Sequence, residues 1–111
     1  MAHGSHDYID DPRNADIKIN INGELFPRSE AKVSVFDSGF VLGDGVWEGL
    51  RVHNGRIAFL TEHLDRLYEG AKALDVELGV TRQQLEARLY ETLHRNNMDE
   101  SSGVHIRLMV S

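Results

Sequence analysis

The sequence of 111 residues contains no cysteine, which excludes a disulfide framework, a thiolate metal site and a cysteine nucleophile. It also has no cluster of lysine and arginine, and with a formal net charge of −6 it offers no basic surface for a nucleic acid. No apolar run approaches the roughly 20 residues that a membrane span needs. The polar, acidic start lacks the apolar segment of a signal peptide. We therefore expect a cytoplasmic protein with neither a nucleic-acid nor a membrane partner.

What is present fits a single globular domain. Apolar residues make up 41% of the chain and charged residues 27%, and the length suffices for one domain with its own core. Residues 1–16 are expected to form a flexible N-terminal tail. His3 and His6 lie in this tail beside Gly4 and Ser5, a composition typical of a mobile terminus, so we expect no metal there.

Two Asn-Gly pairs predict two β-hairpins. Asn-Gly suits a two-residue turn because both positions of that turn adopt positive φ. Alternating or β-branched residues flank each pair, as strands require. The predicted strands are residues 17–21 and 24–26 around Asn22-Gly23, and residues 50–52 and 56–59 around Asn54-Gly55.

Two further segments resemble strands. Residues 33–36 predict a short strand, followed by an irregular, glycine-containing connection over residues 37–45. Residues 104–111 alternate at first and then become continuously apolar, which is typical of a buried or central strand. Because such a strand is an unusual place for a chain to stop, we expect Ser111 to mark a break within a longer protein.

Apolar residues at spacings of three and four predict two amphipathic helices between these strands. We expect Thr61 to cap the first helix and Thr81, with Gln84, to form a capping box on the second. The expected buried stripes are Leu64, Leu67, Tyr68, Ala71 and Leu74 in the first helix and Leu85, Leu89 and Leu93 in the second.

The stretch GDGVWEGLR, residues 43–51, contains more glycine and charge than a core strand needs. Glycine permits unusual backbone conformations and close approach by another group. Strand alternation predicts that Trp47 and Arg51 share one face while Glu48 points the other way. We expect Glu48 to accept backbone hydrogen bonds or to pair with Arg51. Trp47 is compatible with either a pocket or an ordinary core.

The order of these segments resembles one family. The NGE hairpin, AKVSVFDSGFVLGDGVWEGLRV, the NGR hairpin, LTEHLDRLYEGAKAL, a second helix and VHIRLMVS together are similar to the N-terminal domain of fold-type IV pyridoxal-phosphate enzymes. This family, the class IV aminotransferases, includes branched-chain, D-amino-acid and (R)-selective amine transaminases and aminodeoxychorismate lyases. The resemblance covers residues 17–111 and implies an α+β fold, an antiparallel or mixed sheet with two helices.

The resemblance also implies site residues. Arg66 matches the arginine that holds the phosphate of pyridoxal 5'-phosphate, a role that suits the arginine fork. The alternative is a surface arginine paired with Glu62, one helical turn earlier. Trp47 and Arg51 match positions that line the substrate pocket, although Arg51 could instead pair with an acid.

The last strand matches two more substrate-binding positions. His105 and Arg107 stand where branched-chain aminotransferases often have tyrosine and arginine, near the substrate. Histidine in place of tyrosine changes the hydrogen-bonding end of the pocket and leaves the substrate class open. A purely structural histidine is the other interpretation of His105.

The family requires a lysine that forms a Schiff base with the cofactor, and none of Lys18, Lys32 and Lys72 matches it. We therefore expect that lysine to lie beyond Ser111, so this chain would contain no catalytic residue of its own. The resemblance implies a homodimeric transaminase that moves an amino group between a branched-chain or hydrophobic amino acid and a 2-oxo acid. The alternatives are a D-amino-acid or (R)-amine transaminase, a lyase, or, if the chain ends at Ser111, a non-catalytic binding module.

Overall fold

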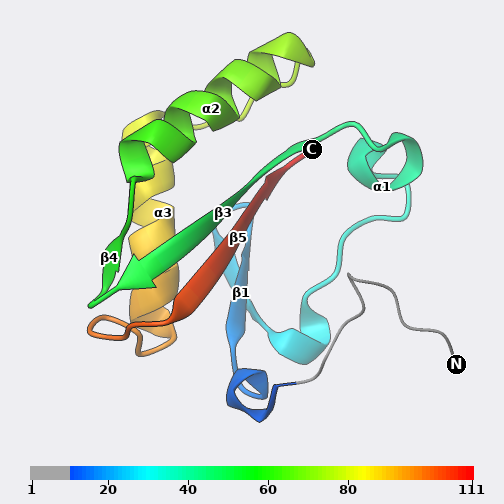
Figure 1. Ribbon diagram of the computed structural model, residues 1–111. Coiled ribbons are helices and arrows are strands. Elements are labelled where there is room, and N and C mark those ends of the chain that lie inside the picture. The colour runs from blue at the N-terminus through cyan, green and yellow to red at the C-terminus, as the bar shows by residue number, and fades with distance from the viewer. Residues whose placement is uncertain (1–10) are drawn as a thin grey trace, which may run out of the picture.

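The computed structural model describes residues 11–111. Figure 1 shows an α+β arrangement in which two antiparallel sheets are accompanied by two long helices, and this confirms the predicted fold class. The elements in chain order are η1 (Pro12–Asn14), β1 (Lys18–Ile21), β2 (Glu24–Pro27), η2 (Arg28–Glu30), α1 (Ser38–Leu42), β3 (Val46–His53), β4 (Arg56–Ile57), α2 (Leu60–Ala73), α3 (Arg82–Arg95) and β5 (Val104–Val110).

Both predicted hairpins are present. Asn22 and Gly23 have φ values of 55° and 89° and connect β1 to β2. Asn54 and Gly55 have φ values of 50° and 73° and connect β3 to β4. Positive φ at both turn positions is the geometry that the Asn-Gly pairs predict. β4 is shorter than expected because the chain leaves the sheet after Ile57 to enter α2.

The second sheet has the strand order β4-β3-β5, and all of its pairs are antiparallel. β3 is therefore the central strand. The prediction of a buried or central strand at the end of the chain is wrong for the sheet that residues 11–111 form, because β5 pairs with β3 alone. Its inward side chains are only half-buried: Val104, Ile106, Leu108 and Val110.

Helices α2 and α3 supply the core with their predicted stripes. Leu89 and Leu93 of α3 pack with Leu50 and Val52 of β3 and Ile57 of β4. A second cluster joins Leu64 and Leu67 of α2 to Leu85 of α3. Ala71 is buried as expected, Tyr68 is half-buried, and Leu74 at the end of α2 is exposed. The two helices thus cover one face of the sheet, since burying one side is what their pattern dictates.

The predicted caps differ in outcome. Thr81 caps α3, accepting a hydrogen bond from the Gln84 backbone, while the Gln84 side chain accepts one from the Thr81 backbone. The prediction that Thr61 caps α2 is wrong. The helix begins at Leu60 after Phe59, which has a φ of 53°, and His63 N–H already donates to the Phe59 carbonyl. Thr61 therefore lies inside the first turn.

The strand predicted at residues 33–36 is also wrong. The segment pairs with no described strand, and it ends in a turn in which Phe36 N–H donates to the Ser34 hydroxyl. Asp37 then caps the short helix α1, which was not predicted, by accepting a hydrogen bond from Gly39 N–H. Figure 1 shows this segment and α1 set apart from the two sheets. Without a partner strand, β-branched composition alone does not make a strand.

Residues 1–10 lie outside the described residues, and with them the interpretation of His3 and His6. Residues 11–16, also assigned to the predicted tail, include the 3-10 turn η1, which Asp11 caps. The first hairpin is attached to the end of α3: Lys18 N–H donates to Asn96 Oδ1 at 2.7 Å, and Asn96 Nδ2 donates back to the Lys18 carbonyl at 3.0 Å.

Candidate active site

Strand β3 separates the predicted site into two faces. Its side chains alternate, so that Trp47 and Arg51 are exposed while Glu48, Leu50 and Val52 are buried under the helices. The alternation predicted from the sequence is therefore confirmed. We call the exposed side the open face and the side under α2 and α3 the covered face.

The open face combines residues from two strands. The register pairs β3 with β5 so that directly opposite residues share a face. The Arg107 guanidinium lies over the Trp47 ring, with 4.2 Å between Cζ and the ring centroid. The six residues of the open face are Trp47, Gly49, Arg51, His105, Arg107 and Met109.

Glycine at position 49 is required by the close approach of a side chain from the neighbouring strand. A Cβ atom at this position would lie 3.0 Å from His105 Nε2 and 3.2 Å from His105 Cε1. The His105 ring thus rests over the Gly49 backbone, and any side chain there would displace it. The structure therefore brings Trp47, Arg107 and His105 together around one glycine, with Arg51 directly opposite His105 in the register.

Arg66 lies elsewhere, on the covered side of β3. Its guanidinium donates to the Glu48 carboxylate from Nε, at 3.1 and 3.0 Å to Oε1 and Oε2, and from Nη2, at 2.8 Å to Oε1. His63, one turn earlier on α2, places Nδ1 2.6 Å from Glu48 Oε1. In the part of the chain that the structure describes, Arg66 forms no hydrogen bond or ion pair with an open-face residue.

These contacts correct two expectations. Glu48 does not pair with Arg51, because an offset of three residues puts the two side chains on opposite faces of a strand. Arg66 does not pair with Glu62 in the described contacts; its carboxylate partner is Glu48. Sequence reasoning missed this group of three residues. The available signal was an acid on the buried stripe of a strand, since a buried charge requires a partner.

The electrostatics of the group follow from its geometry. Hydrogen bonds from Arg66 lower the pKa of Glu48, against the desolvation that would raise it, and the His63 hydrogen bond adds to the lowering. The Glu48 carboxylate in turn raises the pKa of Arg66. Since an ionised carboxylate only accepts hydrogen bonds, His63 donates through Nδ1.

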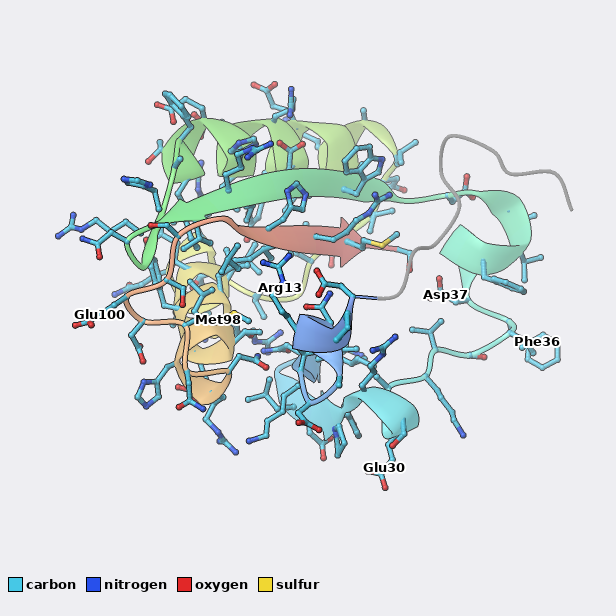
Figure 2. All side chains as sticks on the ribbon, turned by 60° about the horizontal axis from the view of Figure 1, so that its bottom comes forward. Arg13, Glu30, Phe36, Asp37, Met98 and Glu100 are labelled. Atoms are coloured by element: carbon cyan, nitrogen blue, oxygen red, sulfur yellow. The ribbon has the colours of Figure 1, made fainter. Side chains whose placement is uncertain are left out.

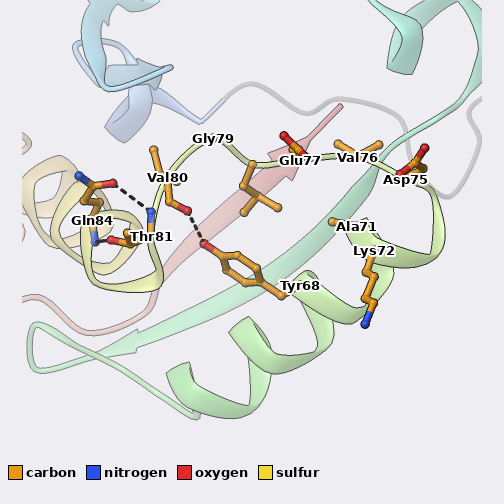
Figure 3. A pocket seen from close by; sticks show the side chains of 11 residues that line it. Tyr68, Ala71, Lys72, Asp75, Val76, Glu77, Gly79, Val80, Thr81 and Gln84 are labelled. Carbon is orange, nitrogen blue, oxygen red and sulfur yellow. Dashed lines mark hydrogen bonds between the residues drawn. The ribbon is translucent and has the colours of Figure 1, made fainter.

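No predicted site residue borders a pocket of about 700 Å³ in the described structure. Figure 3 shows it between the end of α2 and the start of α3, where the Tyr68 hydroxyl donates to the Val80 carbonyl. Within residues 11–111 no three acidic or histidine side chains gather so as to hold a metal ion. Across the same residues, no helix is long and apolar enough to cross a membrane.

Comparison with known proteins connects this geometry to a family. The family model for amino-transferase class IV matches residues 45–111, which include β3, both long helices and β5. The chain belongs to the class IV aminotransferases. This membership confirms the resemblance inferred from the sequence motifs.

Individual class IV relatives come from two branches. A putative branched-chain-amino-acid aminotransferase of Methanocaldococcus jannaschii is 42% identical over 95 residues, which are 86% of this chain and 32% of the relative. A D-alanine aminotransferase of Staphylococcus haemolyticus is 38% identical over 90 residues, 81% of this chain and 32% of the relative. The chain thus spans about a third of the length of these relatives.

Solved class IV structures share the fold. A branched-chain aminotransferase from the thermophilic archaeon Thermoproteus uzoniensis, with norvaline, matches with a TM-score of 0.74 and 31% identity, over 85% of this chain and 32% of that one. A second branched-chain amino acid aminotransferase, complexed with N-(5'-phosphopyridoxyl)-L-glutamate, matches with the same TM-score and 32% identity over the same shares. The described domain corresponds to the N-terminal part of these enzymes.

Arg66 fits a phosphate group by its own geometry. Its side chain is 71% exposed, although one edge of the guanidinium is bound to Glu48. Among residues 11–111, no hydrogen bond uses Nη1, so the outer edge of the fork can donate to an anion. An arginine paired on one edge and open on the other suits a phosphate.

Proposed function

We propose that these residues form the N-terminal domain of a pyridoxal-phosphate-dependent transaminase that moves an amino group between an amino acid and a 2-oxo acid. The observation that carries the proposal is Arg66, because a class IV chain presents here an open guanidinium edge of the shape that a phosphate requires. Bound pyridoxal 5'-phosphate would supply the electron sink for the reaction.

The chain's own residues would have two tasks. Arg66 would hold the cofactor phosphate, and the open face would form one side of the substrate pocket. There the Trp47 ring and Met109 offer apolar contact, while Arg51, His105 and Arg107 offer hydrogen-bond donors.

The lysine that carries the cofactor is proposed to lie in another part of the protein. Lys18 is on β1, Lys32 follows η2 and Lys72 is near the end of α2, and all three are exposed. Within residues 11–111 none of them forms a hydrogen bond with Arg66 or with the open face. The class IV relatives are about three times as long as the part that this chain matches, so such a lysine could lie in the unmatched part.

For the substrate we propose a branched-chain or similarly hydrophobic L-amino acid. The identities to branched-chain aminotransferases and the apolar side chains of the open face support this choice. The D-alanine aminotransferase relatives favour a second candidate, transamination of a D-amino acid. His105 is central to the choice, because its ring borders Gly49 at the middle of the open face.

An amino-transfer assay on the whole protein with added pyridoxal phosphate separates the two candidates. With 2-oxoglutarate as acceptor, we expect L-leucine to serve as donor and D-alanine not to. Transfer from D-alanine alone would reject the first candidate in favour of the second. Transfer from neither would reject the proposed hydrophobic and D-alanine specificities together.

We further propose that the parent protein is a cytoplasmic homodimer. Exposed apolar side chains in the segment around α1 support self-association, since surface patches of this kind mark interfaces. In Figure 2 the Phe36 side chain points away from the rest of the domain. Analytical ultracentrifugation of the parent protein at micromolar concentration should give twice the mass of its single polypeptide chain. A monomeric mass would refute the proposal. The exposed apolar residues of this segment are Val33, Val35, Phe36, Phe40, Val41 and Leu42.

A further inference from the structure

We propose that Glu48 is a positioning residue that sets the orientation of the Arg66 guanidinium for the cofactor phosphate. The inference rests on the proposed function, in which Arg66 is the phosphate ligand. It goes further in assigning a task to a side chain that touches neither the phosphate nor the substrate. It is carried by the way in which β3 and α2 bring three polar side chains to one point on the covered face.

The Glu48 side chain is held in one place by the strand that carries it. It is 4% exposed and lies on the central strand of its sheet, two residues before the fully buried Leu50 on the same face. Its backbone is held by the β3–β5 register, in which it is directly opposite Leu108. A carboxylate held in this way has little freedom to follow a moving partner, so the partner must adapt to it.

Arg66 makes its contacts through one edge of a planar group. Nε and Nη2 both donate to the carboxylate, at 2.8–3.1 Å. Because the guanidinium is rigid and flat, fixing these two nitrogens also fixes the direction of Nη1 and of the second Nη2 hydrogen. An arginine side chain with 71% exposure would otherwise sample many rotamers. Glu48 therefore limits where the phosphate-binding edge can point.

His63 strengthens this arrangement. Its Nδ1 lies 2.6 Å from the same Oε1 that accepts from Arg66 Nη2. His63 and Arg66 are three residues apart on α2, so they reach one carboxylate from the same helix face. The carboxylate keeps one hydrogen-bond donor even when Arg66 moves. The orientation of Glu48 thus does not depend on Arg66 alone.

A charge effect and a positioning effect of Glu48 on Arg66 predict opposite changes in phosphate binding. The Glu48 carboxylate offsets the Arg66 charge, so removal of the carboxylate should strengthen phosphate binding if net charge alone mattered. If Glu48 acts by positioning, its removal should weaken phosphate binding although the site becomes more positive. A structural ion pair would change the stability of the protein and leave phosphate recognition as it was.

The test compares two ligands on the whole protein that carries these residues. Dissociation constants of pyridoxal 5'-phosphate and of pyridoxal, which lacks the phosphate, give the selectivity for the phosphate as their ratio. We expect Glu48→Gln to lower this ratio about tenfold, which is the loss of roughly one charge-assisted hydrogen bond. Glu62→Gln is the matched control, because it removes one negative charge from α2 at an exposed position. It should leave the ratio unchanged.

A second variant covers the case in which Glu48→Gln does not fold. Glu48→Asp keeps the charge but withdraws the carboxylate by one methylene, so positioning predicts a lowered ratio and net charge predicts no change. An unchanged or raised ratio in a folded Glu48 variant would overturn the inference. Wild-type protein that binds pyridoxal 5'-phosphate no better than pyridoxal would instead refute phosphate binding itself, and the proposed function with it.

Discussion

At the scale of single residues, Glu48 is the charged side chain that the described part of the chain buries. A buried carboxylate is stable only when donors compensate for its lost hydration, and Arg66 and His63 provide them. Removal of one partner from such a group is expected to cost more than a surface ion pair would, because the remaining charge stays desolvated.

The lowered pKa of Glu48 predicts acid sensitivity. The folded pKa lies below the ordinary value of 4.5, so this group contributes stability that is complete above about pH 4.5 and is lost as pH falls through the folded pKa. In urea unfolding near neutral pH, the free energy of unfolding of Glu48→Gln should be about 1–2 kcal/mol lower than that of the wild type. The difference should shrink on acidification. A difference that is constant with pH would contradict the assignment.

The sequence alone predicts only some of the contacts that Glu48 makes. The opposite orientations of Trp47 and Glu48 follow from strand alternation, and the same rule already separates Glu48 from Arg51. Which cation then reaches Glu48 depends on where α2 crosses β3, and no sequence period encodes that crossing. His63 and Arg66 were visible as residues of one helix but not as partners of this strand.

At the scale of elements, local chemistry was predictable and tertiary partners were not. The two Asn-Gly hairpins and the Thr81 capping box are short-range features, and each has the predicted geometry. The segment of residues 33–36 and the position of β5 depended on strands elsewhere in the chain. The high β propensity of β5 correctly predicts a strand. The same property is misleading for residues 33–36, because a strand needs a neighbouring strand with which to pair.

The two threonines at the helix starts give an element-scale prediction. Thr81→Ala removes a capping side chain and should destabilise the fold by about 1 kcal/mol. Thr61→Ala is the matched control, because Thr61 lies within the first turn of α2 and alanine is the better helix former there. Chemical unfolding midpoints should fall for the first variant and stay or rise slightly for the second. Equal losses of stability in the two variants would show that Thr61 also caps its helix.

At the scale of the whole molecule, the domain presents two surfaces suited to further contacts. One is the open face of β3 and β5, with Trp47 54% and Met109 67% exposed. The other is the outer edge of Arg66 on the covered side of β3. Under the proposed function, the open face would border the substrate and the outer edge of Arg66 would donate to the cofactor phosphate.

Membership of the family could be recognised from motif order, whereas the arrangement of the site could not. GDGVWEGLR and EHLDRL are specific as a pair, but the residues expected to form the site end up on opposite sides of one strand. Under the proposed function, the identity of the amino donor would depend on side chains that meet across β3 and β5. His105 lies over Gly49 in the middle of this face, a contact that only the register of β3 and β5 reveals.

The most direct measurement is the affinity of the whole protein for pyridoxal 5'-phosphate, with and without Arg66. Arg66→Ala should weaken binding about 10- to 100-fold, because it removes charge-assisted hydrogen bonds to the phosphate. Arg82→Ala, which breaks the ion pair with Asp65 at the start of α3, is the control and should bind as the wild type does. Equal affinities of the wild type and Arg66→Ala would show that Arg66 only ties α2 to β3, and would contradict the account.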